Sequence, residues 1–335
     1  MKRITILLSV VLVSIISIWS SISPPLPDSV EAEVKNAIDR GFDGIIVYVD
    51  KKGEKTHYTA GWKNRENKVP TDPKSLFKIA SISKLYIAAA VAKLVYVDSL
   101  SLDKTLADYL PDLVDRIENS KTITLKMLLQ HRSGIPDFID HPDYPWGKPP
   151  MKIRETLELI LDLAADFSAD KRSEYSNTNY LLIGEILNNT LGYSHHHYIK
   201  KEILLPLKLY RTYSLLDEVD LNDVMSGYFI GYDLDIKQND YIIPGGSMLA
   251  TAKDVGAFLR ALVDGSLLNE EEQEIYNSIS KYEHTGLLPG YQSIAKYHKD
   301  IDAVIIQFIN TSGGNSWSKS ESVYERIFRI LKKIY

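Results

Sequence analysis

Seven Ser-x-x-Lys tetrads occur in the chain, a pattern in which a lysine amine lies one helical turn from a serine hydroxyl and accepts its proton. The seven begin at Ser75, Ser81, Ser101, Ser168, Ser278, Ser293 and Ser316. Only Ser81 opens a long, otherwise apolar segment that predicts a helix, so its hydroxyl would lie where backbone N–H groups favour negative charge. Lys84 would lie on the same face, with apolar neighbours that favour its neutral, basic form. The simpler alternative for an isolated tetrad is an N-cap serine followed by a surface lysine.

Two further motifs occur once each. Tyr175-Ser176-Asn177 is the one Tyr-x-Asn and His284-Thr285-Gly286 is the one His-x-Gly, whereas Lys-Thr-Gly is absent from the sequence. Each has an ordinary alternative, because Asn177 could cap a following helix and His284 could be a strand histidine. The three motifs nevertheless follow one another at intervals of 94 and 109 residues, counted from Ser81 to Tyr175 and from Tyr175 to His284. Their order favours a single site for acyl transfer.

These motifs and their flanking segments resemble the serine β-lactamase-related superfamily, nearest the branch of class C β-lactamases and D,D-carboxypeptidases (penicillin-binding proteins). The resemblance extends from about residue 30 to the C-terminus. The segments that carry it are residues 77–84, 100–103, 109–111, 128–136, 206–207 and 245–252. The fold implied is an α+β arrangement, an antiparallel sheet flanked by helices with an inserted helical subdomain, and the site would lie between them.

The resemblance implies a role for each motif residue. Ser81 would attack a carbonyl, Lys84 would take its proton, and Tyr175 would relay a proton to the leaving group and later help to activate water. In the substrate-binding set, Asn177 would hold the substrate side chain. His284, Thr285 and Gly286 would face the far end of the substrate. The backbone N–H groups of Ser81 and Leu287 would form the oxyanion hole.

Departures from the family pattern bear on the substrate. His284 stands where a lysine is usual, so binding of a substrate carboxylate would depend on pH. Leu287 and Leu288 replace small residues and predict an apolar rim. No segment resembles the separate glutamate base of class A enzymes. These differences favour a peptidase of D-amino-acid peptides in the cell envelope, either D,D-carboxypeptidase-like or D-aminopeptidase-like, or a carboxylesterase, over a β-lactamase.

A non-catalytic envelope sensor or assembly module is the alternative outside enzymes. It predicts loss of Lys84, Tyr175 or Asn177, and all three are present. The partner expected is a small peptide, an ester or a cell-wall fragment, with the oligomeric state left open. No cofactor is implied. A net charge of −5, with no basic run beyond Lys332-Lys333, argues against nucleic acid.

Two clusters of polar residues invite a metal assignment, and for both an ordinary surface is the simpler interpretation. His195-His196-His197 predicts an exposed, unoccupied group at a helix start. A loop is expected to be solvated and contains Asp137, Asp140, His141 and Asp143. No metal ligands are therefore expected.

Hydrophobic periodicity places the elements that must position the site. Helices are predicted from a cap at Asp28 to Arg40 and over 81–97, 251–263 and 321–334, with Asn269 capping another. Strands are predicted over 45–50, 55–62, 291–298 and 303–310. Because strands stand at both ends of the chain, the two ends must meet in one sheet, with a helical subdomain over roughly 98–240 between them.

The first two dozen residues form a separate unit. Lys2 and Arg3 precede a run without charges from Ile4 to Ile22, and Ser23-Pro24 follows. This pattern indicates export, either by a cleaved signal peptide over 1–23 or by an uncleaved anchor attached to the membrane through residues 4–22. The hydrolase domain would span 24–335 and work in the periplasm or otherwise outside the cytoplasm. The chain has no cysteine, which excludes thiol nucleophiles and disulfides.

Overall fold

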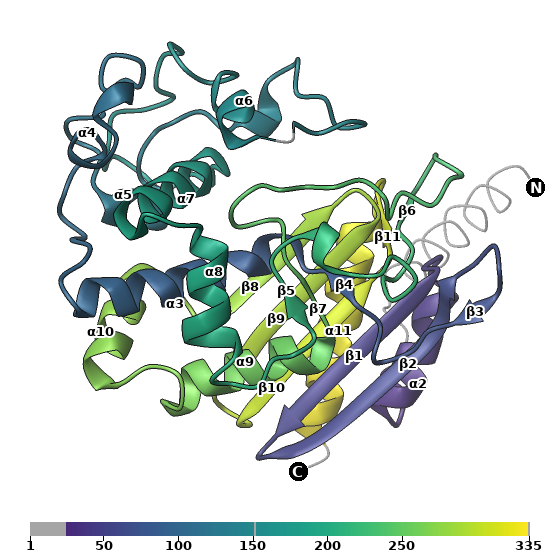
Figure 1. The fold of residues 1–335 in the computed structure, drawn as a ribbon. Coiled ribbons are helices and arrows are strands. Elements are labelled where there is room, and N and C mark those ends of the chain that lie inside the picture. Colours follow the sequence, from purple (N-terminus) through teal and green to yellow (C-terminus); the bar gives the residue numbers. More distant parts are fainter. Residues whose placement is uncertain (1–24, 151, 334–335) are drawn as a thin grey trace, which may run out of the picture.

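The computed structural model describes residues 25–150 and 152–333, and it confirms the α+β class with an antiparallel central sheet (Figure 1). The sheet has six strands in the order β3-β2-β1-β10-β9-β8. Their bounds are β1 Gly44–Lys51, β2 Glu54–Asn64, β3 Val69–Pro70, β8 Glu283–Leu288, β9 Tyr291–His298 and β10 Ala303–Ile309. The four strands predicted over 45–50, 55–62, 291–298 and 303–310 are present as β1, β2, β9 and β10.

The two ends of the chain meet at the centre of this sheet, as predicted. β1 pairs antiparallel with β10, from Ile45 opposite Ile309 to Lys51 opposite Ala303. Every residue of β1 and β10 is buried, because helices cover both faces of the sheet. The sheet is therefore a layer between two helical layers, which explains why its central strands are continuous apolar runs.

One helical layer comes from the two termini, α2 (Val30–Ile38) and α11 (Ser316–Lys333), which pack on each other and on the sheet. The predicted bounds are wrong by a few residues. Ser29, whose hydroxyl accepts from Ala32 N, caps α2 in place of Asp28. α11 begins five residues before the predicted Glu321, with Ser316 buried in its first turn.

The opposite layer carries the segments around Ser81. It comprises α3 (Ser83–Tyr96), α9 (Ala252–Asp264) and α10 (Glu270–Ile279). α9 packs against β1, β9 and β10, and α10 packs against α3, where Lys93 pairs with Glu272 at 3.4 Å. The predicted cap Asn269 is confirmed, because its side chain accepts the N–H of Glu272. Thr251, the first residue of the helix predicted over 251–263, is the N-cap of α9, and its side chain accepts the N–H of Asp254.

The segment predicted as a helical subdomain contains short helices joined by long loops. The helices are α4 Leu106–Tyr109, α5 Leu125–Leu129, α6 Ile153–Leu157, α7 Thr178–Leu191 and α8 His195–Ile199. Single turns of 3₁₀ helix lie at Pro111–Leu113, Phe138–Asp140 and Leu216–Glu218, and a π-helical turn lies at Lys200–Leu204.

Among the described residues, five short strands lie outside the central sheet, some of them in this segment and some in its flanks. They are β4 Phe77–Lys78, β5 Thr212–Tyr213, β6 Tyr228–Phe229, β7 Leu249–Ala250 and β11 Thr311–Ser312.

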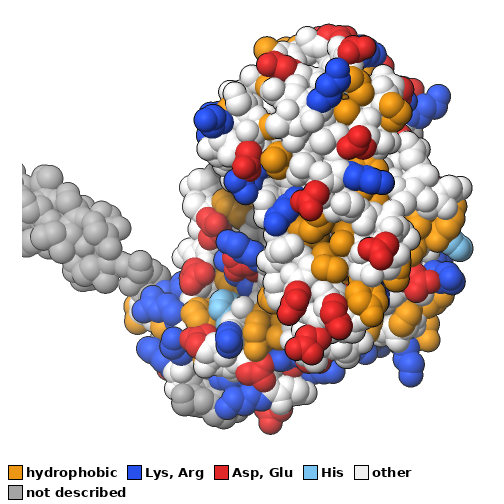
Figure 2. Space-filling model, turned by 90° about the vertical axis from the view of Figure 1, so that its left-hand side faces the viewer, with side chains coloured by type: hydrophobic (Ala, Val, Ile, Leu, Met, Phe, Trp, Pro, Cys, Tyr) orange, Lys and Arg blue, Asp and Glu red, His pale blue; other side chains and the backbone are white. Residues whose placement is uncertain are grey.

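Two of these short-strand groups hold loops against the body of the molecule. β4 and β5 both pair with β7, and β6 pairs in parallel with β11. On the face drawn in Figure 2, acidic and basic side chains alternate, with apolar side chains between them. No helix among the described residues is long and apolar enough to cross a membrane, and the predicted export segment lies outside those residues.

The prediction of an exposed histidine cluster at residues 195–197 is wrong for its first member. His195 is buried, and its Nδ1 lies 2.9 Å from the side-chain oxygen of Asn188 at the end of α7. Burial, with a smaller contribution from the adjacent His196, holds the pKa of His195 well below its usual value. The residue is an inward-facing contact between α7 and α8.

Candidate active site

Ser81 lies in a tight turn that precedes α3, whereas the sequence predicted it at the first turn of the helix itself. The turn is the 3₁₀ segment Ala80–Ile82, and Ala80 has a left-handed φ of 50°. That conformation costs a non-glycine residue on the order of 1–2 kcal/mol. Two buried hydrogen bonds hold it, from Ser83 Oγ to Ala80 O at 2.6 Å and from Ile79 N to Met248 O at 3.0 Å. Strain of this kind, held by surrounding bonds, is typical of functional positions.

The amine of Lys84 lies at the centre of the site. Its side chain is buried, and Nζ lies 3.1 Å from Ser81 Oγ, 3.0 Å from Asn177 Oδ1 and 3.0 Å from Gly245 O. The last two atoms are acceptors only. A neutral amine has two N–H donors for them and one lone pair, which is left directed at the Ser81 hydroxyl. The arrangement therefore suits Lys84 as the base that the sequence predicted.

Tyr175 reaches the same serine from the segment that precedes α7. Its hydroxyl donates to Ser81 Oγ at 2.9 Å, while 45% of its side chain stays exposed. The ring of His131 stacks on the Tyr175 ring at 4.4 Å, and His131 Nδ1 accepts from Ser176 N at 3.2 Å. Burial first, then the charges of Lys84 and His284, lower the pKa of His131 to about 3, so its ring is a neutral support for Tyr175.

Asn177 connects Lys84 to a residue that the sequence interpretation placed in a solvated loop. Asn177 stands at the N-cap position of α7, but its side chain makes no cap bond. Its Nδ2 donates to Asp137 Oδ2 at 2.9 Å, which fixes the amide with its oxygen toward Lys84. Burial raises the pKa of Asp137. The prediction of a solvated Asp137 is therefore wrong, because this carboxylate orients Asn177.

His284 lies on β8 beside this group, with its ring centroid 6.3 Å from that of Tyr175. Its Nδ1 lies 2.5 Å from the carbonyl oxygen of Thr285, which places the ring proton on Nδ1 and leaves Nε2 as an acceptor. Burial and then the charge of Lys84 lower the pKa of His284 to about 4. The expectation of an imidazole that gains its charge near neutral pH is thus revised, since the ring is neutral there.

Gly286 allows β8 to lie directly on the nucleophile turn. A Cβ at this position would overlap Ile79 O and Ser293 Oγ, and Ser293 Oγ itself donates to Ile79 O at 2.9 Å. Thr285 follows the strand register opposite Ile294. Leu287, the next residue of β8, is 56% exposed, so the predicted apolar rim is present at this position. The close contact of the turn with β8 brings the segments of the two proposed oxyanion donors, Ser81 and Leu287, together.

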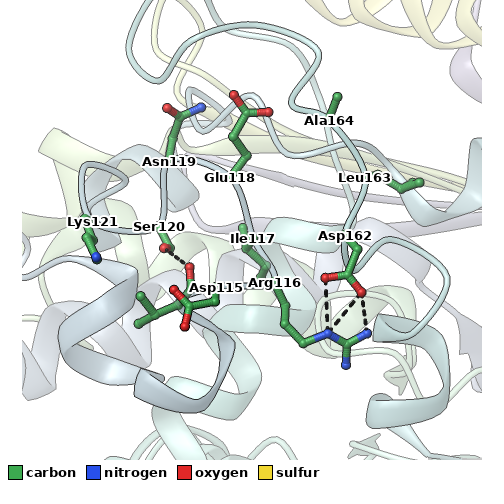
Figure 3. Close-up of a pocket in the computed structure, with 11 residues that line it drawn as sticks. Asp115, Arg116, Ile117, Glu118, Asn119, Ser120, Lys121, Asp162, Leu163 and Ala164 are labelled. Carbon is green, nitrogen blue, oxygen red and sulfur yellow. Dashed lines mark hydrogen bonds and ion pairs between the residues drawn. The ribbon is translucent and has the colours of Figure 1, made fainter.

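A cavity of about 520 Å³ lies elsewhere, between residues 114–121 and 162–164, and shares no residue with this site (Figure 3). Some of its polar groups have protein partners. Arg116 pairs with Asp162 at 2.7 Å, and Ser120 Oγ donates to Val114 O at 2.8 Å. Within residues 25–150 and 152–333, no group of three or more His, Asp or Glu side chains is arranged to hold a metal ion. The cluster of side chains around Ser81 is therefore the candidate active site.

Three groups in the cluster were given no role from the sequence. Asp137 and His131 lie in a stretch that also contains the apolar residues Ile135 and Phe138, which are buried in the structure. These apolar neighbours are the sequence feature that could have indicated that the stretch lies inside the protein. The third group, the carbonyl of Gly245, gives no side-chain signal. Gly245 has a left-handed φ of 78°, and a Cβ there would lie 2.9 Å from Lys84 Cγ, so glycine is needed for its close approach to the lysine.

Comparison with known proteins places these features in context. A family model described as beta-lactamase matches residues 30–278. A protein of Bacillus subtilis (strain 168) that carries the name penicillin-binding protein PbpX is 25% identical, and the match covers 88% of this chain and 76% of that protein. Some other curated relatives are longer, and the chain spans less than two thirds of their length.

Two solved structures share the fold. The D-amino acid amidase from Ochrobactrum anthropi SV3, complexed with L-phenylalanine amide, has a TM-score of 0.80 at 22% identity, and the match covers 91% of this chain and 97% of the amidase. A D-stereospecific amidohydrolase from Streptomyces sp. has a TM-score of 0.74 at 19% identity, with 89% and 98% covered.

Proposed function

Because the chain belongs to the beta-lactamase family of serine hydrolases, we propose that it hydrolyses small amides or peptides of D-amino acids through an acyl-enzyme on Ser81. The observation that carries the proposal is the pair of contacts on Ser81 Oγ, with Lys84 Nζ at 3.1 Å and the Tyr175 hydroxyl at 2.9 Å. A base and a proton donor on one hydroxyl are what nucleophilic acyl transfer needs.

In the proposed acylation, Ser81 Oγ attacks the carbonyl carbon of the scissile amide as its proton passes to the neutral amine of Lys84. The carbonyl oxygen gains negative charge and is held by the N–H groups of Ser81 and Leu287, a contribution of about 10²–10³ in kcat for each such donor. The C–N bond then breaks, and Tyr175 passes a proton to the departing amine. Lys84 returns a proton to the tyrosine, and the acyl group stays on Ser81 as an ester.

Deacylation reverses these roles with water in place of the amine. Tyr175 and Lys84 take a proton from a water molecule that attacks the ester carbonyl, and the Ser81–acyl bond breaks. The proton returns to Ser81 Oγ, and the carboxylic acid leaves. No further carboxylate base is required, because the same two groups face the serine oxygen throughout.

His284 supports the D-aminopeptidase-like reading over the D,D-carboxypeptidase-like one. A neutral ring whose second nitrogen, Nε2, is an acceptor does not attract a carboxylate, but it accepts a hydrogen bond from an ammonium or amide N–H group. A substrate with a free amino group beside the reacting carbonyl fits this polarity. The names of the two structural neighbours, a D-amino acid amidase and a D-stereospecific amidohydrolase, support the same substrate class.

An ester is the second candidate, and the exposed Leu287 favours it. An apolar side chain at the rim would contact an acyl or alcohol chain that carries no charge. The two candidates share Ser81, Lys84 and Tyr175, and they differ only in the leaving group.

Intact-protein mass spectrometry after exposure to a fluorophosphonate tests the nucleophile. The wild-type protein should gain one adduct, Ser81→Ala should gain none, and Ser75→Ala and Ser101→Ala should label as the wild type does. These serines open tetrads of the same type, but Ser75 is buried and neither contacts Lys84. An adduct that maps to another serine would overturn the assignment.

A substrate panel tests the class. We expect turnover of D-amino-acid amides at a rate at least about tenfold above that of the L-enantiomers, which corresponds to roughly 1.4 kcal/mol. A D-Ala-D-Ala peptide with a free carboxylate should be slower, and a penicillin slower still. Faster turnover of a neutral short-chain ester than of every amide would move the esterase candidate ahead.

A further inference from the structure

Two lysines flank Ser81 at equal distances in the sequence, and both bind one segment of the chain, residues 236–248. Lys84, three residues after the serine, contacts the carbonyl oxygen of Gly245. Lys78, three residues before it, donates from Nζ to the carbonyl oxygen of Lys237 at 2.7 Å and to that of Asn239. The proposed mechanism uses Lys84 and assigns nothing to Lys78.

Lys78 is a buried lysine, which is uncommon in a folded protein. Its side chain is 4% exposed, and among the described residues no carboxylate lies within 4 Å of its amine. A buried ammonium without such a partner is costly, and an apolar side chain of the same length would avoid that cost. Its two hydrogen bonds both go to the backbone of the 236–248 segment. The charged and titratable groups that face it are Asp235, Lys237, Asp240 and Tyr241 in and beside that segment and Tyr291 on β9.

The segment leads directly from these bonds to the base. After the two carbonyls bound by Lys78, Tyr241 is buried, and Pro244 packs against α7, where a Cβ on Gly184 would lie 2.8 Å from the proline Cβ. Gly245 follows with its carbonyl on Lys84. The segment ends at Met248, whose carbonyl accepts from Ile79 N at 3.0 Å in the nucleophile turn.

We propose that Lys78 is a positioning residue, which holds residues 236–245 so that the Gly245 carbonyl keeps the Lys84 amine directed at Ser81. The part of this inference that concerns catalysis rests on the proposed function. The role of Lys78 in holding the segment is independent of the proposed function, because it depends only on the hydrogen bonds from Lys78 to the segment backbone.

Lys78→Met tests both parts, because methionine keeps the length of the side chain and removes the charge and the donors. Amide hydrogen exchange should become at least about tenfold faster in peptides covering 236–245, and kcat should fall at least about tenfold with KM nearly unchanged. Lys78→Arg, which keeps hydrogen-bond donors for the two carbonyls, should restore part of both. Lys63→Met is the matched control, since Lys63 also donates to a backbone carbonyl, that of Asn222, at an exposed position.

The pH dependence of exchange in the wild-type protein gives a readout that needs no variant. Burial lowers the pKa of Lys78 to about 7, whereas opening of the segment to water would return it to about 10.5. The closed form therefore binds this proton less tightly, and a rise in pH favours closure. Protection of 236–245, corrected for the intrinsic exchange rate, should be flat below about pH 7 and rise about tenfold per unit above it. Lys78→Met should show no such rise.

The outcomes separate the two proposals. Unchanged exchange and unchanged kcat in Lys78→Met would overturn the inference while leaving the proposed function intact. Faster exchange in that variant, together with a wild-type protein that is never labelled at Ser81, would overturn the proposed function and keep the role of Lys78 in holding the segment. If Lys78→Met does not fold, flat protection of the wild-type segment between about pH 7 and 9 would overturn the inference.

Discussion

At the scale of single residues, the site depends on how a few side chains divide their hydrogen bonds. Lys84 Nζ donates to Asn177 Oδ1 and Gly245 O and lies 3.1 Å from Ser81 Oγ. Asp137 fixes the direction of the Asn177 amide, and His131 supports the ring of Tyr175.

His284 provides the prediction at this scale. For kcat/KM, which reports the free enzyme, the ratio of a carboxylate-bearing peptide to a neutral ester should be flat from about pH 5.5 to 8.5. The reason is that the pKa of His284 is lowered to about 4, so the ring gains a proton, and with it an attraction for the carboxylate, only as the pH falls toward that value. Steady-state rates for both substrates, measured with one enzyme preparation, give the ratio and cancel the shared base.

His284→Lys is the companion variant. A fixed charge should raise the ratio at neutral pH by about tenfold, equivalent to roughly 1.4 kcal/mol. A wild-type ratio that declines between about pH 6 and 8 would instead show that His284 titrates near its ordinary value and serves as a carboxylate anchor.

At the scale of elements, the decisive contact is that of β8 with the nucleophile turn. Gly286→Ala should lower kcat by about 10²–10³, the effect of one lost oxyanion donor, because a Cβ would overlap Ile79 O and force the strand carrying Leu287 away from Ser81. The protein should still unfold cooperatively, since β8 is an edge strand of the sheet. Kinetics and urea unfolding on the same preparation would check both statements.

Gly147→Ala is the control for that substitution, because a Cβ there would meet no atom within 4 Å. It should leave kcat unchanged. Full activity of Gly286→Ala would mean that β8 tolerates a shift and that the Leu287 N–H group does not hold the oxyanion.

At the scale of the whole molecule, the site is assembled from segments that lie about 200 residues apart. Ser81 and Lys84 come from the start of α3, whereas His284 and Gly286 come from the penultimate hairpin of the chain. The N-terminal and C-terminal parts of the chain are joined by the pairing of β1 with β10. The chemistry therefore requires both ends of the domain.

Export is the prediction at this scale. A reporter fused after residue 30 should be exported, because Lys2-Arg3 and the apolar run that follows have the pattern of an export signal. Fractionation and intact mass of the native protein would distinguish the two forms. Loss of the leader with release by salt indicates a signal peptide, and a full-length chain in the membrane indicates an anchor. A fusion lacking residues 2–23 is the control, and retention of the unmodified fusion in the cytoplasm would contradict both forms.

The sequence by itself determined the fold class and the side chains on which the proposed chemistry rests. Periodicity placed α9, β9 and β10 to within a residue, because these elements bury a regular face in the core. Seven tetrads have the same spacing, and only Ser81 opens a long apolar segment, so that context together with the order of the three motifs predicted Ser81 and Lys84 as the reacting pair.

Only the tertiary structure decided the properties that depend on distant neighbours. The pKa of His284 follows from its burial and from the charge of Lys84, 200 residues earlier in the chain. The carbonyl of Gly245 became a partner of the base through the path of the backbone, which side-chain patterns do not record. Lys78 has no distinguishing feature in the sequence, and only the fold places the carbonyl oxygens of residues 237 and 239 beside its amine. Local patterns encode which groups are present, whereas burial and electrostatic environment arise from packing between segments that are remote in sequence.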